Sequence, residues 1–219
     1  MPREVFVAGQ VLTAAELNVV SDQSVMVFAD SSARTAAISS PSEGMVTYLE
    51  DTNGVEVYNG SAFTSVGQST ILQVLSATKT DTFSTTSTTF ADVTDLTLTL
   101  TPAATSSKVL VSFSINLGLP NTAGVQVRLM RDSTPIAVGD AGLASQKQST
   151  THTYPGVNTD TRNRSMQFLD SPNTTSATVY KLQIITNTST VYVNRSSSDN
   201  NTAYGGRTAS TITAMEVAG

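Results

Sequence analysis

Apolar and polar residues alternate with a period of two along most of this chain. The clearest case is residues 95–102, DLTLTLTP, where Leu96, Leu98 and Leu100 fall on one face and threonines on the other. Many short antiparallel strands favour a β-sandwich, of jelly-roll-like form, over an α/β arrangement. About nine strands are expected: 71–76, 95–102, 108–118, 125–132, 135–139, 165–170, 177–185, 190–195 and 210–217.

A different pattern precedes these strands. Residues 45–67, MVTYLEDTNGVEVYNGSAFTSVG, hold two turn signals, Asn53-Gly54 and Asn59-Gly60, between three short alternating runs. A strand is expected at 24–30 and a short helix at 30–38, capped by Asp30 or Ser31. The sequence therefore predicts a small α+β module over 24–68. A module of this size is marginal alone, so we expect it to lean on a neighbour or on copies of itself.

The first residues predict a third part of the chain, an anchoring segment over 1–23. Thr13 to Glu16, TAAE, forms a capping box that would start a short helix through Leu17. A helix this short is unstable alone in water and is expected to dock on a partner. Val11, Leu12 and Leu17 are the candidates for that contact. The sandwich domain is expected over 69–219.

Composition narrows the function classes. Charged residues make up 13% of the 219 residues and the formal net charge is −5, which argues against a nucleic-acid-binding surface. Cysteine is absent, so neither disulfides nor thiolate metal sites are expected. The start lacks the apolar core of a signal peptide, and no stretch approaches a membrane span. We expect synthesis in the cytoplasm and no membrane insertion.

The search for catalytic chemistry finds little. The single histidine, His152, lies in the long polar stretch 140–164 without a Gly-x-Ser-x-Gly elbow, so a solvated loop histidine is the favoured interpretation. No carboxylate pair is flanked by aromatic platforms, and no phosphate-cradling glycine loop occurs. We predict no enzymatic activity, no catalytic residues, no metal site and no cofactor.

The chain resembles a known family over nearly its whole length. VLTAAELN, followed by VMVFADSSARTAAISSPSEGMVTYLEDTNGVEVYNGSAFTSVG, resembles the N-terminal module of bacteriophage minor tail and fibre-type proteins. Phe63 stands where tryptophan is common in that module. The later segments, including TKTDTFSTTSTTFADVTDLTLTLTPAATSSKVLVSFSINLG and RTASTITAMEVAG, look like a β-rich domain of phage tail or head fibres.

The resemblance implies a structural virion protein, assembled in the host cytoplasm as a homotrimer. Its N-terminal part would attach to other virion proteins of the tail or capsid, and its β domain would project. Contact with a host surface glycan is a further expectation, for which Tyr154, Asn158, Arg162 and Arg164 are the candidates because they offer phenol, amide and guanidinium groups.

Two other functions stay open at this point. One is a capsid or tail decoration or adaptor protein without a receptor role, and the other is a glycan-cleaving enzyme.

Overall fold

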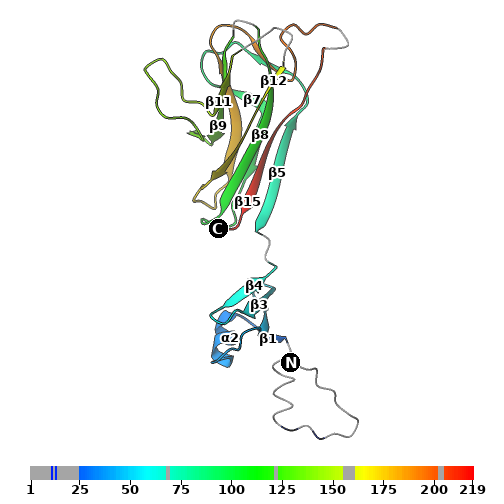
Figure 1. Cartoon of the computed structure of the whole chain (residues 1–219), viewed down its shortest axis with the longest axis vertical. Helices are drawn as coiled ribbons and strands as arrows, with labels where there is room; N and C mark the ends of the chain where they lie inside the picture. Colours follow the sequence, from blue (N-terminus) through cyan, green and yellow to red (C-terminus); the bar gives the residue numbers. More distant parts are fainter. Residues whose placement is uncertain are drawn as a thin grey trace. The chain divides into compact units, whose positions relative to one another are not determined.

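The structure, a computed structural model, describes Val11, Thr13 and residues 25–67, 70–120, 123–154, 161–201 and 205–219. It divides into two compact units, 1–69 and 70–219 (Figure 1). The expected helix after Thr13 lies outside the described residues, apart from Thr13 itself.

The described part of the N-terminal unit, residues 25–67, is one four-stranded sheet with one helix. The strand order is β1-β2-β3-β4, with β1 and β2 parallel and the other pairs antiparallel. Asp30 caps the helix, because its Oδ1 accepts from the Ala33 N–H at 2.7 Å. Both predicted turns are present, because Asn53 and Gly60 have the positive φ values that such turns require, 47° and 90°. The elements are β1 Met26–Phe28, α2 Ser31–Ala37, β2 Val46–Leu49, β3 Gly54–Tyr58 and β4 Phe63–Val66.

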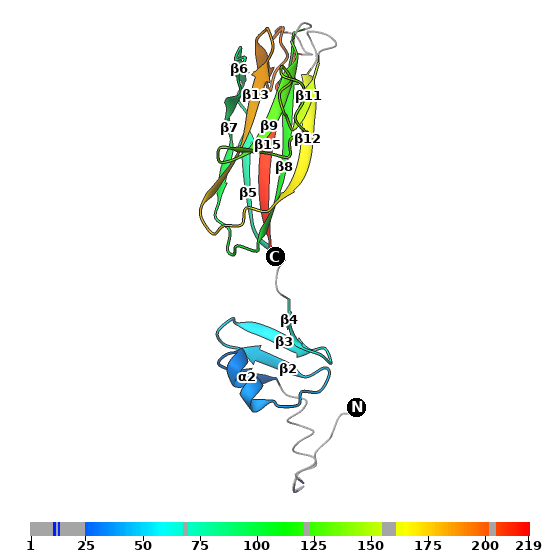
Figure 2. The ribbon, with the colours of Figure 1, turned by 90° about the vertical axis from the view of Figure 1, so that its left-hand side faces the viewer.

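The two faces of this small sheet differ. The helix α2 lies on one face (Figure 2), where Arg34 pairs with Glu56 and stacks over the Phe63 ring at 4.3 Å. The other face carries Val27, Tyr48, Val55 and Val66 in register across all four strands, with Val46 and Val57 beside them. Val27 and Val66 are 58% and 54% exposed. We call this second surface the valine face.

The second unit is an antiparallel β-sandwich, as the alternation predicted. In the first sheet, β8 is central: β12 pairs along one edge, and β15 followed by β14 along the other. β5 pairs with β15, and β6 with β14. The strands are β5 Ile71–Lys79, β6 Phe83–Thr85, β8 Lys108–Gly118, β12 Thr161–Asp170, β14 Val191–Val193 and β15 Ser210–Val217.

The second sheet packs against the first. β9 pairs with β13 on one side and with β10 and β11 on the other, and β13 pairs with β7. Its strands are β7 Ala91–Leu100, β9 Val125–Arg131, β10 Thr134–Ile136, β11 Thr151–Thr153 and β13 Thr178–Thr186.

The core between the sheets follows the alternation of the sequence. Leu96, Leu98 and Leu100 are buried, while Thr97 and Thr99 between them are exposed, which confirms the predicted pattern. On β8 every second residue from Val109 to Leu117 is buried. The expectation of a mainly β chain with an antiparallel sandwich is therefore confirmed.

Several details differ from the prediction, among them the start of β7 at Ala91 instead of residue 95 and the end of β10 at Ile136 instead of residue 139. The long polar stretch 140–164, with its predicted loop histidine His152, is not a single loop: 151–153 form β11 and β12 begins at Thr161, because these residues find partners on β9 and β8. The strand β6 was also missed, since Phe83–Thr85 is too short to show a period. On β7, Asp95 has φ of 64° at an irregularity in the pairing with β13, and the alternation resumes after it.

A polar cluster joins the two sheets inside the sandwich. The buried Tyr180 hydroxyl on β13 donates to Asp170 Oδ2 on β12 at 2.7 Å. Arg131 Nη1 on β9 donates to Asp170 Oδ1 at 2.9 Å and to the Ser171 carbonyl at 3.2 Å. Burial, followed by the bond to the Asp170 carboxylate, raises the pKa of Tyr180 far above its ordinary value.

Candidate functional site

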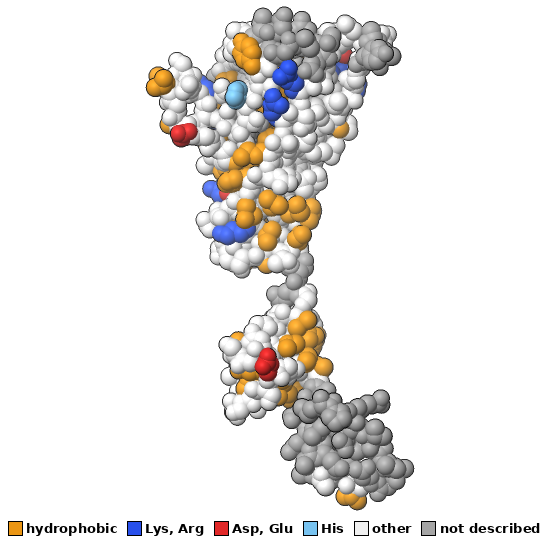
Figure 3. Space-filling model, viewed as in Figure 1, with side chains coloured by type: hydrophobic (Ala, Val, Ile, Leu, Met, Phe, Trp, Pro, Cys, Tyr) orange, Lys and Arg blue, Asp and Glu red, His pale blue; other side chains and the backbone are white. Residues whose placement is uncertain are grey.

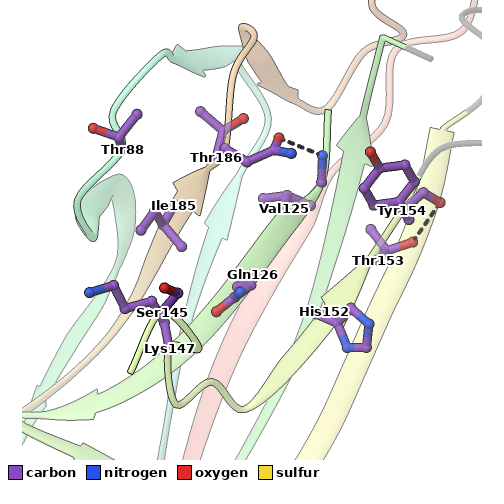
Figure 4. A pocket seen from close by; sticks show the side chains of 12 residues that line it. Thr88, Val125, Gln126, Ser145, Lys147, His152, Thr153, Tyr154, Ile185 and Thr186 are labelled. Atoms are coloured by element: carbon purple, nitrogen blue, oxygen red, sulfur yellow. Dashed lines mark hydrogen bonds between the residues drawn. The ribbon is translucent and has the colours of Figure 1, made fainter. Parts of the chain in front are cut away.

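A cavity of about 340 Å³ opens on the sandwich where several chain segments meet. Figure 4 shows side chains from the β6–β7 connection, β9, the β10–β11 connection and the end of β13 around one space. Ile185 and Gln126 come from the sheet, whereas Lys147 and His152 come from the β10–β11 connection and β11. The other lining residues are Thr88, Gly124, Val125, Ser145, Thr153, Tyr154, Thr186 and Asn187.

Tyr154 forms one wall because Gly124 leaves room for its ring. A Cβ added at Gly124 would lie 3.0 Å from Tyr154 Cδ2, a distance at which the ring would have to shift. The backbone of Gly124 is also bonded to another lining residue, because its N–H donates to Asn187 Oδ1 at 2.8 Å. The Tyr154 side chain, 61% exposed, is therefore held against a fixed backbone.

The polar groups around this space are suited to a hydroxyl-bearing ligand. Gln126 Oε1 is shielded from solvent and has no hydrogen-bond partner among the described residues. An unpaired amide oxygen favours a ligand that donates a hydrogen bond. Lys147 and His152 add an ammonium and an imidazole group, and the Tyr154 ring offers an apolar surface with a polar tip.

A second cavity, of about 460 Å³, adjoins the first and shares Thr88, Lys147 and Ile185 with it. Its sheet side is formed by Arg128, whose guanidinium lies 3.8 Å from the centre of the Phe90 ring. Arg128 Nη2 donates to Gln183 Oε1 at 2.9 Å. Burial lowers the pKa of Arg128 below its ordinary value.

The structure places four of the seven candidate contact residues. Val11 is 88% exposed, whereas Leu12, Leu17 and Asn158 lie outside the described residues. Tyr154 lines the first cavity. Arg162 pairs with Leu117 in the ladder between β12 and β8.

Arg164 connects the two sheets at the edge of the sandwich. Its Nε donates to the His152 carbonyl at 3.3 Å, Nη1 donates to the Asn163 carbonyl at 2.8 Å, and Nη2 donates to Thr153 Oγ1. These bonds hold β11 of one sheet beside β12 of the other. This contact gives Arg164 a structural role, and its predicted role in surface contact stays a prediction.

Sequence reasoning missed Gln126, Lys147, Thr88 and Asn187 as cavity residues. They are separated by up to 99 positions along the chain, from Thr88 to Asn187, so no local motif could contain them. The only sequence signal was the length of the 140–164 stretch, because long connections often carry function.

Two kinds of feature are absent from the described residues. No helix there is long and apolar enough to cross a membrane. No group of three or more histidine, aspartate or glutamate side chains in the same residues could hold a metal ion.

Comparisons with known proteins give distant structural likeness only. No protein-family model and no curated protein matches the chain. The infectious bursal disease virus Gx strain structure is similar with a TM-score of 0.38 and 11% identity, covering 74% of this chain and 41% of that one. The T=1 particle structure derived from the same virus gives 0.39 and 12%, covering 82% and 44%. This chain thus spans less than half of those chains, and at such TM-scores the likeness carries no argument.

Proposed function

We propose that this chain is a structural component of a bacteriophage virion, a short fibre or spike without enzymatic activity. It attaches to other virion proteins of the tail or capsid through its N-terminal segment and contacts the host surface through the sandwich. The observation that carries the proposal is the N-terminal motif series, LTAAELN followed by FADSSARTAAI and EGMVTYLEDTN, which resembles phage fibre-type proteins.

The geometry supports a division of labour between the two units. Residues 25–67 of the N-terminal unit form a small sheet with one helix, and the candidate anchor residues Val11, Leu12 and Leu17 precede them in the sequence. The sandwich offers a rigid scaffold, and the cavity beside Tyr154 lies among its connections. Rigid β scaffolds commonly present binding groups on such connections.

The first test is whether the full-length chain is on the particle. Antibodies against the sandwich should label purified phage particles in electron micrographs, at the tail or at the capsid. Substitution of Val11, Leu12 and Leu17 by Asp should abolish incorporation, whereas Leu143→Asp, at an exposed leucine of the sandwich, should not. Absence of the wild-type chain from particles would overturn the proposal.

The second test separates host contact from pure decoration. Particles carrying Gln126→Ala together with Tyr154→Ala should adsorb to host cells at least tenfold more slowly. Thr99→Glu, at an exposed strand residue that lines neither cavity, serves as the control in the same unit. Unchanged adsorption would replace the spike with the decoration or adaptor alternative. Release of reducing sugar from host polysaccharide would instead indicate the glycan-cleaving enzyme.

A further inference from the structure

One outer surface of the sandwich combines exposed apolar residues with a nearly complete lack of charge. It belongs to the sheet of β5, β15, β8 and β12, and we call it the uncharged face. Its side chains are Leu72, Val74, Ser76, Thr78, Thr211, Thr213, Met215, Val217, Lys108, Leu110, Ser112, Ser114, Asn116, Asn163, Ser165, Gln167 and Leu169. Lys108 is the one charged side chain among them, and its Nζ donates to Ser171 Oγ.

The apolar residues of this face form a continuous row. Met215 pairs with Val74 on one side and with Leu110 on the other, and Leu110 pairs with Leu169. Val74 and Leu169 are each 54% exposed, and Leu72 beside them is 45% exposed. Figure 3 shows hydrophobic side chains gathered at the end of the sandwich where β5 begins and β15 ends.

The polar part of the face is already hydrogen-bonded within itself. Ser76 Oγ lies 2.9 Å from Thr213 Oγ1, and Asn163 Nδ2 donates to Ser114 Oγ and Asn116 Oδ1 at 2.7 and 3.1 Å. Polar groups that bond to one another lose little when water is removed. Small serine and threonine side chains also let another flat surface approach closely. This face can therefore be buried without leaving unpaired charges.

We propose that the uncharged face and the valine face of the N-terminal unit are the surfaces through which copies of this chain associate. The inference rests on the proposed function for the number of copies, three. In the sandwich, the central strands β15 and β8 lie in the middle of the proposed contact, and the valine face forms a separate contact within the N-terminal unit.

Charge favours another copy of the chain as the partner. The chain carries a net charge of −5, so copies repel each other unless they meet where carboxylates are absent. The residues that define the uncharged face and the valine face include no aspartate or glutamate. A strongly charged partner would find no complementary groups there, whereas an identical uncharged face fits without a penalty.

The size of the faces is also adequate. Four strands spaced at about 4.8 Å, with seven paired residues at about 3.4 Å each, give the uncharged face a projected area of about 450 Å². The valine face adds about 250 Å² by the same estimate. Stable interfaces bury about 800 Å² per partner, and accessible area exceeds projected area. The apolar row is one contiguous patch, and contiguous exposed apolar patches often mark protein–protein contacts.

The test is the solution mass of the full-length chain by light scattering after size exclusion. Wild-type protein should have three times 22.9 kDa, about 69 kDa. Val74→Glu should lower the mass threefold, because it places a carboxylate in the apolar row. Thr99→Glu is the matched control: Thr99 is an exposed strand residue on the other sheet, and this variant should remain trimeric.

The valine face is tested in the same way. Val66→Glu should lower the mass, and Ser61→Glu, in the exposed turn before β4, should not. Circular dichroism and thermal melting of each variant establish that it is folded.

Three results would overturn the inference: a wild-type mass of 22.9 kDa, a wild-type dimer, or a folded Val74→Glu protein that stays at 69 kDa. A trimer that is absent from purified particles would remove the proposed function and leave the interface. A monomer found on particles would remove the proposed interface and leave the proposed function.

Discussion

The two outer faces of the sandwich are built from the same strand pattern but carry opposite chemistry. On the sheet of β7, β13 and β9, outward residues form charged and amide contacts: Lys181 Nζ and Gln183 Nε2 donate to Asp92 at 2.8 and 2.7 Å, and Arg128 donates to Gln183. On the other sheet the outward residues are valine, leucine, methionine, serine, threonine, asparagine and glutamine, with Lys108 as the one charged side chain. We call the first surface the charged face.

The difference shows what each face is suited to contact. The charged face satisfies its own groups and borders the two cavities, so it resembles a surface that meets water and small ligands. The uncharged face gains most from contact with another protein surface. Alternation alone would have assigned both faces to solvent, and only the identity of the outward residues separates them.

The largest expected effect on stability comes from removing the carboxylate that links the two sheets. Asp170→Ala would leave the Tyr180 hydroxyl and the Arg131 guanidinium without their shared carboxylate inside the sandwich. Removing one partner of a buried pair costs about 3 kcal/mol of the free energy of unfolding or more. Urea unfolding of the sandwich measures it. Asp170→Asn keeps an acceptor for Tyr180 and should cost less, and an equal loss in both variants would contradict this account.

The next effect concerns acid stability. Glu216 on β15 is buried, which opposes its ionisation, but bonds from Gln73 Nε2 and the Ala103 N–H outweigh burial and lower the pKa of Glu216 below 4.5. The folded state therefore gains stability above pH 4.5 and loses it as the pH falls below that value. Glu216→Gln should cost about 1–2 kcal/mol at pH 7 and flatten the loss of stability in acid. Urea midpoints measured from pH 7 to pH 3 check the slope.

A smaller effect tests the charged face. The Asp92 side chain is 53% exposed, and its pKa is lowered because bonds from Lys181 and Gln183 outweigh the opposing effect of partial burial. Exposed pairs contribute little, so Asp92→Ala should reduce the free energy of unfolding by about 0.5 kcal/mol. The reduction should shrink at about 1 M salt, since salt screens exposed charges. A loss that is independent of salt would show that packing, not charge, dominates there.

The smallest expected effect on stability concerns Met215, an outward residue of the uncharged face. Met215 points outward, so Met215→Lys in dilute, monomeric protein should change the free energy of unfolding by less than about 0.5 kcal/mol. At concentrations where copies associate, the same change should lower apparent stability, because association adds to stability only in the wild type. Equal unfolding midpoints of variant and wild type at both concentrations would contradict a role of this face in association.

The sequence alone determined most of the long strands, because burial on one side of a sheet enforces a period of two. The predicted segments 108–118 and 210–217 coincide with β8 and β15, and the Asp30 cap and both turns of the N-terminal sheet were also predictable. These features depend on neighbours only a few residues away, where side-chain chemistry acts directly on the backbone.

Tertiary structure decided which residues that are distant in the sequence become neighbours in space. Nothing in the local sequence predicts that Lys79 is buried, yet it is 1% exposed. Its Nζ donates to Asp81, Thr94 and Asp95 at 2.8–3.2 Å, so the buried ammonium group is paired. Its pKa is raised, since these carboxylates outweigh the opposing effect of burial.

The cavity and the apolar row have the same origin. Each joins residues that are far apart in the chain: strand pairing brings Val74 and Met215 together in the row, and the packing of strands and connections assembles the cavity. Alternation fixes which side of a strand a residue faces, but not which strand becomes its neighbour.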